Sequence, residues 1–131
     1  GFTYSGHPVA TAVALRNIQI IEDEKLYENA GKNGEYMLNE LKKLNDKPYV
    51  GNVRGKGLMM IVEYVANKET KEKHDPSLNI VPKLEAATRK RNIIVRATPN
   101  GVAISPPLTI QKPEIDTVVE GVADALEEVL G

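Results

Sequence analysis

Three hydroxyl-bearing side chains stand together near the start of the chain, where they could bind an anion. Thr3, Tyr4 and Ser5 lie in a short segment that contains two glycines and is followed by Pro8, a residue suited to the first turn of a helix. A helix N-terminus presents free N–H groups and the positive end of the helix dipole, so a phosphate or carboxylate can be bound there. Hydroxyl residues before a helix also serve as simple caps, and their chemistry alone favours that simpler role.

Arg96 is a second candidate for binding an anion. It follows the apolar residues 93–95, which we expect to form a short strand, and it precedes a Thr-Pro-Asn-Gly turn at residues 98–101. A guanidinium at the end of a rigid strand can form two parallel hydrogen bonds with a carboxylate. The alternative is a structural salt bridge with one of the 18 acidic residues, and the pattern alone favours that salt bridge.

No other group of residues predicts a catalytic or metal site. His7 and His74 are far apart and lack clustered acidic partners, so a cap or surface role is expected for each and no metal ligand set is proposed. The segment 54–57, Arg-Gly-Lys-Gly, is not a phosphate loop, because its last glycine leads into a strand; we expect a bend between strands there. Basic residues at 42–43 and 89–91 are explained as helix C-termini. With no cysteine and no Ser-His-Asp arrangement, no catalytic residue is assigned.

Composition and charge exclude several classes of function. The chain has 131 residues, enough for one domain, and its 17 basic and 18 acidic residues give a net charge of −1. This balance removes the electrostatic argument for binding nucleic acid or an anionic membrane. No apolar run approaches the roughly 20 residues of a membrane-spanning helix. The absence of cysteine fits a cytoplasmic protein. The chain also starts without Met and directly within a motif, so we expect a piece of a longer protein.

Apolar periodicity predicts four helices. They are expected over residues 8–24, 25–44, 78–91 and from 113 to the end. The first two could be continuous or kinked near Asp23, and Asn45 is a plausible left-handed stop for the second. The first helix has an alanine-rich face suited to close packing against another element, formed by Ala10, Ala14, Ile18 and Ile21.

Short strands are expected between these helices, over residues 49–53, 58–65, 93–95 and 102–105. Residues 66–77 read as a solvated loop. The order of elements predicts an α+β fold in two layers, in which helices cover a small antiparallel or mixed sheet and a long helical segment precedes it. We expect residues 1–131 to form a single domain.

Several separated motifs resemble one enzyme family. They are FTYSGHP at residues 2–8, VRGKGLM at 53–59, IIVR at 93–96 and SPPL at 105–108, with a closing helix after PEID. In this order and spacing they are similar to the C-terminal small domain of class III (ω-type) aminotransferases, pyridoxal-phosphate (PLP) enzymes of fold type I. The resemblance covers essentially the whole chain. One departure is the 98–101 turn, where family members often carry a Gly-Asp-like sequence.

The resemblance implies roles for particular residues. Phe2 and Thr3 would approach the PLP phosphate of the neighbouring subunit in a homodimer, with Thr3 donating its hydroxyl and backbone N–H. Arg96 would bind the carboxylate of a keto acid or amino acid and swing aside for an apolar amine. Gly55 and Gly57 would be structural.

The same resemblance implies that this chain is incomplete as an enzyme. Family members carry PLP on a lysine of the large domain, upstream of the FTYSGHP segment, and no lysine here lies in a matching motif. The aspartate that pairs with the pyridine nitrogen also belongs upstream. PLP chemistry needs both groups. We therefore expect a fragment that is inactive alone.

The expected reaction is transfer of an amino group from an amine or ω-amino acid to a keto acid such as pyruvate. Within the family, an ornithine- or GABA-type transaminase or an aminomutase is the alternative. Outside it, the alternative is a stand-alone, non-catalytic α+β domain for ligand binding or interaction.

Overall fold

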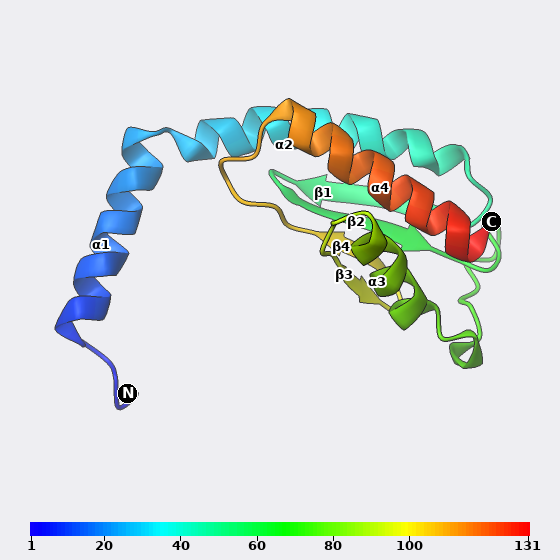
Figure 1. Ribbon diagram of the computed structural model, residues 1–131, viewed down its shortest axis with the longest axis horizontal. Coiled ribbons are helices and arrows are strands. Elements are labelled where there is room, and N and C mark those ends of the chain that lie inside the picture. Colours follow the sequence, from blue (N-terminus) through cyan, green and yellow to red (C-terminus); the bar gives the residue numbers. More distant parts are fainter.

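The computed structural model describes all of residues 1–131 and has an α+β architecture (Figure 1). Its helices are α1 (Pro8–Asp23), α2 (Leu26–Lys42), α3 (Ile80–Lys90) and α4 (Lys112–Leu130). Its strands are β1 (Val50–Lys56), β2 (Met59–Tyr64), β3 (Arg96–Thr98) and β4 (Gly101–Ile104). Two short 3-10 turns, Lys43–Asp46 and Pro76–Leu78, connect the elements. The predicted fold class is confirmed.

The strands form one antiparallel sheet in the order β1-β2-β4-β3, with β3 at an edge. Alternate residues of a strand point to opposite faces of a sheet, and residues paired directly across strands share a face. One such row, which crosses all four strands, is buried: Val53, Val62, Val102 and Ala97. It packs with α2, α3 and α4 residues such as Met37, Leu84 and Leu126 in the main hydrophobic core. The helices therefore cover one face of the sheet.

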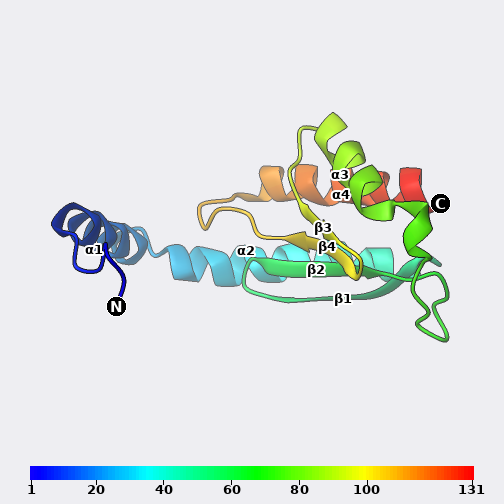
Figure 2. The same cartoon turned by 90° about the horizontal axis from the view of Figure 1, so that it is seen from below.

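The helical conformation is interrupted between α1 and α2, so the two are separate helices and not one continuous helix. Lys25 adopts φ 50°, a left-handed conformation that a continuous helix does not contain. Beyond this break, α1 extends away from the sheet and carries the N-terminus with it (Figures 1 and 2). None of its residues is buried. Packing of the alanine-rich face against another element is therefore not found within this chain.

Two predicted boundaries are wrong. Asn45 is not a left-handed stop, because α2 tightens into the 3-10 turn that contains it. Residues 93–95 do not form a strand, and β3 begins only at Arg96. In the register of β3 with β4, the partners of residues 93–95 would fall on residues 104–106, where the prolines begin. Proline cannot donate a ladder hydrogen bond, so pairing ends there.

The turn between β1 and β2 touches α2 closely. Segment 54–57 is the end of β1 and the start of this turn, as expected of a bend between strands, and Gly57 has φ +55°. Gly34 of α2 faces it at such short range that a Cβ atom there would lie 2.0 Å from the Gly57 carbonyl oxygen. Any side chain larger than the hydrogen atom of glycine at position 34 would therefore force α2 or the turn to move.

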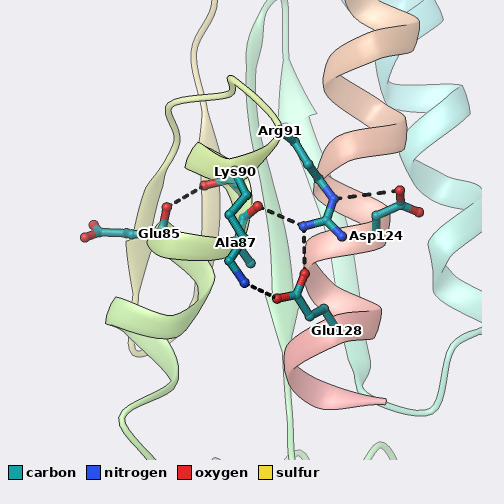
Figure 3. A network of polar contacts seen from close by, with 7 residues as sticks. Glu85, Ala87, Lys90, Arg91, Asp124 and Glu128 are labelled. Carbon is teal, nitrogen blue, oxygen red and sulfur yellow. Dashed lines mark hydrogen bonds and ion pairs between the residues drawn. The ribbon is translucent and has the colours of Figure 1, made fainter.

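Charged side chains tie α3 to α4 (Figure 3). At the end of α3, Lys90 Nζ and Arg91 Nη1 each lie 2.8 Å from a carboxylate oxygen of Glu128. Arg91 also donates to the Ala87 carbonyl at 2.8 Å and lies 3.8 Å from Asp124. The basic cluster at 89–91 does close a helix, as predicted, and it also pairs with the neighbouring helix.

Candidate functional site

The face of the sheet opposite the helices carries the candidate site. A row on this face crosses all four strands and consists of Arg54, Ile61, Ala103 and Arg96. It lies one residue along each strand from the buried row, so its side chains point away from the core. None of these residues is buried. The row ends in an arginine at each edge of the sheet.

Arg96 is exposed and forms no ion pair with any acidic residue of the chain. The structural salt bridge that the sequence pattern favoured is therefore not found in this structure. Its neighbour Ala97 is 7% exposed and packs into the core, which fixes the backbone from which Arg96 projects. This arrangement suits recognition of an external carboxylate, because a guanidinium without a permanent partner remains available to one.

A shallow, open hollow of about 520 Å³ lies on the same face, over β1, β2 and β4, and Arg96 is not part of its lining. Its lining includes Arg54, Met59, Ile61, Ala103 and Ser105. It thus reaches Ala103, the residue paired with Arg96 across the strands. Its floor is apolar, and the guanidinium of Arg54 and the hydroxyl of Ser105 lie at its margins.

Two asparagines of α2 hold the loop that follows Ser105. Asn33 is buried and donates to the Ile110 carbonyl at 2.8 Å. Asn29 donates to the Leu108 carbonyl at 2.6 Å. These positioning contacts were missed from the sequence; the signal that could have found them is two asparagines four residues apart on a helix face expected to be apolar.

The N-terminal loop lies far from the sheet, at the free end of α1 (Figures 1 and 2). Phe2 is 87% exposed, and the Ser5 hydroxyl accepts from the Phe2 N–H at 3.1 Å. His7 caps α1 by accepting from the Ala10 N–H at 3.4 Å, so its predicted cap role is confirmed. Thr3 is exposed and its hydroxyl has no hydrogen bond within the chain, which leaves that hydroxyl free for an external anion. Thr3 and Arg96 are not brought together.

His74 packs against Tyr64, with ring centroids 6.0 Å apart, and its Nε2 atom is buried without a hydrogen-bond partner. A cap or surface role for His74 is therefore wrong. Burial raises the pKa of Tyr64, whose hydroxyl donates to the Thr98 carbonyl.

No group of three or more histidine or acidic residues lies close enough together to hold a metal ion. No helix combines the length and apolar character needed to cross a membrane.

Comparison with known proteins identifies the family. The family model described as aminotransferase class-III matches residues 1–126, and the chain belongs to this family. It is 38% identical to a diaminobutyrate–2-oxoglutarate transaminase of Halomonas elongata, over 98% of this chain and 28% of that protein. It is 39% identical to a putrescine–pyruvate aminotransferase of Pseudomonas aeruginosa, over 91% of this chain and 26% of that protein.

Solved structures give the same family. An (S)-enantioselective ω-transaminase of Thermomicrobium roseum superposes with a TM-score of 0.97 at 60% identity, covering 100% of this chain and 29% of that one. The chain therefore spans less than a third of the length of the relatives that it matches.

Proposed function

We propose that this chain is the C-terminal small domain of a PLP-dependent ω-amine:pyruvate-type aminotransferase. The intact enzyme transfers an amino group from an amine or ω-amino acid to a keto acid. The observation that carries the proposal is Arg96, an arginine without an ion-pair partner on the uncovered face of the sheet. Its partner across the strands, Ala103, lines an open hollow of about 520 Å³. An ornithine- or GABA-type transaminase remains the alternative within the family. A non-catalytic binding domain is the alternative outside it.

The N-terminal loop fits the proposed cofactor through its unpaired hydroxyls. His7 already caps the helix and Ser5 closes the turn on Phe2, whereas the hydroxyls of Thr3 and Tyr4 have no hydrogen bond within the chain. Following the family resemblance, Thr3 would bind the phosphate of PLP, which acts as the electron sink for amino transfer when it is bound. The remaining binding groups, including the lysine that carries PLP, belong to the large domain in this proposal.

The separation of the loop from the sheet supports a homodimer. Because α1 holds the N-terminal loop away from the sheet, the loop and Arg96 of a single copy do not meet at one substrate. In the proposed dimer, the two residues reach the cofactor of the neighbouring subunit, while Arg96 serves its own. The exposed apolar side chains of the loop and α1 gain a partner in this arrangement, including Phe2, Tyr4, Val9, Val13 and Ile18.

The Arg96→Ala variant of the intact enzyme tests the proposal. We expect kcat/KM for pyruvate to fall by the equivalent of about 2–4 kcal/mol, because a paired charged contact is lost. An amine donor without a carboxylate should lose much less in its own half-reaction. Arg89→Ala, which removes another exposed arginine without an ion pair, is the matched control. Equal losses for both substrates together with a lower melting temperature would instead make Arg96 a structural residue.

A further inference from the structure

Arg54 stands at the other end of the row that Arg96 begins. The two residues occupy opposite edge strands but the same face, separated by Ile61 and Ala103. Three strand spacings place their Cα atoms about 14 Å apart. Each guanidinium ends a flexible methylene stem, so both charged groups can approach the middle of the row from opposite sides. The hollow extends along this row from Arg54 through Ile61 to Ala103, the residue paired with Arg96.

The charges on this face are unequal. Strand alternation puts Arg54, Lys56 and Arg96 on it, against the single carboxylate of Glu63. Neutralising the face therefore takes about two further negative charges. A ligand with one carboxylate supplies half of that charge, and a ligand with two carboxylates supplies all of it.

Glu63 already forms an ion pair with Arg54. Arg54 Nη1 lies 2.7 Å from Glu63 Oε2, in a pair whose side chains are 53% and 33% exposed. An exposed ion pair of this kind contributes little stability, so an incoming carboxylate can replace Glu63 at low cost. Arg96, in contrast, has no carboxylate to displace. This face thus carries one arginine without an ion pair, Arg96, and one that is paired with a carboxylate of the same chain, Arg54.

We propose that Arg54 binds the distal carboxylate of a dicarboxylate acceptor whose proximal carboxylate is bound by Arg96, and that Glu63 competes for Arg54. The Arg54–Glu63 pair then sets the preference between monocarboxylate and dicarboxylate keto acids. This inference rests on the proposed function and adds the class of acceptor. The apolar floor at Ile61 and Ala103 accommodates the methylene chain between two carboxylates. Relatives of this chain are named for both types of acceptor, 2-oxoglutarate and pyruvate.

The test measures the ratio of kcat/KM for 2-oxoglutarate to kcat/KM for pyruvate in the intact holoenzyme. Glu63→Gln removes the competitor and should raise this ratio by up to about fivefold, the scale of an exposed ion pair. Arg54→Gln should lower it, and Arg54→Lys should give an intermediate value because the charge remains without the planar fork. The change should appear in KM for the dicarboxylate. Glu40→Gln, which removes the carboxylate of the Lys43–Glu40 surface pair, is the matched control and should leave the ratio unchanged.

A calorimetric titration of the holoenzyme with glutarate, a non-reacting dicarboxylate, gives a second readout. Glutarate should bind more tightly to Glu63→Gln and more weakly to Arg54→Gln than to the unchanged enzyme. An unaltered ratio and unaltered glutarate affinity in both variants would overturn the inference, as would equal losses for both acceptors with a lower melting temperature. These outcomes leave the proposed function standing. That function fails separately if the holoenzyme transaminates neither acceptor, or if Arg96→Ala leaves pyruvate kinetics intact.

Discussion

Thr3 is the residue whose proposed role depends on a single hydroxyl. The Ser5 hydroxyl and the His7 imidazole already accept from backbone N–H groups, whereas the hydroxyls of Thr3 and Tyr4 have no hydrogen bond within the chain. Of these two, Thr3 is the residue for which the family resemblance implies a contact with the cofactor phosphate. In the intact enzyme, Thr3→Ala should weaken PLP binding by about 1.5–3 kcal/mol, the scale of one hydrogen bond to a charged group. Loss of cofactor during dialysis measures this change.

Thr11→Ala is the matched control for Thr3→Ala. Its hydroxyl bonds to the His7 and Pro8 carbonyls within α1, so its removal takes away a helix contact and no proposed cofactor contact. PLP affinity should stay unchanged in this variant. An unchanged affinity in Thr3→Ala as well would remove Thr3 from the cofactor site.

At the residue scale, the sequence pattern placed Arg96 directly after a strand at residues 93–95, whereas Arg96 is the first residue of β3. Its availability could not be predicted, because whether an arginine has a salt-bridge partner depends on which acidic residues the fold brings near it. Arg54 was missed for a related reason. Gly55 and Gly57, which follow it, indicated a bend, whereas β1 continues to Lys56. Only the strand register shows that Arg54 shares a face with Arg96.

At the element scale, the contact between α2 and the β1–β2 turn gives a sharp test of packing. Gly34→Ala should destabilise the intact enzyme by about 1–3 kcal/mol, because the new methyl group meets the Gly57 carbonyl and the helix or turn must move. Gly31→Ala lies one turn earlier in α2, with open space around it. It should stabilise by about 0.5–1 kcal/mol through helix propensity. Thermal unfolding distinguishes them, and equal effects would contradict the close approach.

The link between α3 and α4 makes stability depend on pH. Hydrogen bonds from Lys90, and then from Arg91, lower the pKa of Glu128 below its ordinary value of 4.5. A carboxylate with a lowered pKa favours the folded state at neutral pH, and this contribution is lost as the pH falls through 4.5 and below. Glu128→Gln should therefore lower the melting temperature at pH 7 by no more than a few degrees, with a difference that shrinks in acid.

Glu120→Gln serves as the control for Glu128→Gln, since Glu120 is an exposed residue of the same helix without an ion pair. Its melting temperature should follow that of the unchanged protein across the pH range. A Glu128→Gln difference that stays constant from pH 7 to pH 3 would show that the carboxylate's charge is not responsible.

Helices were predicted more accurately than strands for a physical reason. The apolar stripes of α3 and α4 repeat over several turns, and predicted core residues such as Leu84, Val122 and Leu126 are buried as expected. The strands β3 and β4 have three and four residues, too few for an alternating pattern to identify them. Their limits are set by pairing, which ends where Pro106 removes a donor, and such a limit depends on residues elsewhere in the chain.

At the scale of the whole molecule, α1 is the element that the chain alone does not explain. An isolated helix with Val9, Val13, Leu15 and Ile18 all more than half exposed lacks the tertiary packing from which most helical stability comes. The alanine-rich face was expected to pack against another element, and no such packing is found within this chain, so that expectation stays a prediction. In the proposed enzyme, this surface packs against the large domain or the second subunit.

The isolated chain should not catalyse amino transfer, which is the prediction that belongs to the whole molecule. In this proposal the lysine that carries PLP lies on the large domain, and α1 keeps the Thr3 loop away from the Arg96 face, so one chain cannot assemble the site. Mixing residues 1–131 with PLP, an amine donor and pyruvate should give no alanine above a PLP-only control. Product formation is the appropriate measure, because surface lysines react with PLP and change its absorbance without turnover. The intact enzyme under identical conditions is the positive control. Sustained alanine formation by residues 1–131, abolished by Arg96→Ala, would show that this chain holds a complete site and would overturn its assignment as one domain of a larger enzyme.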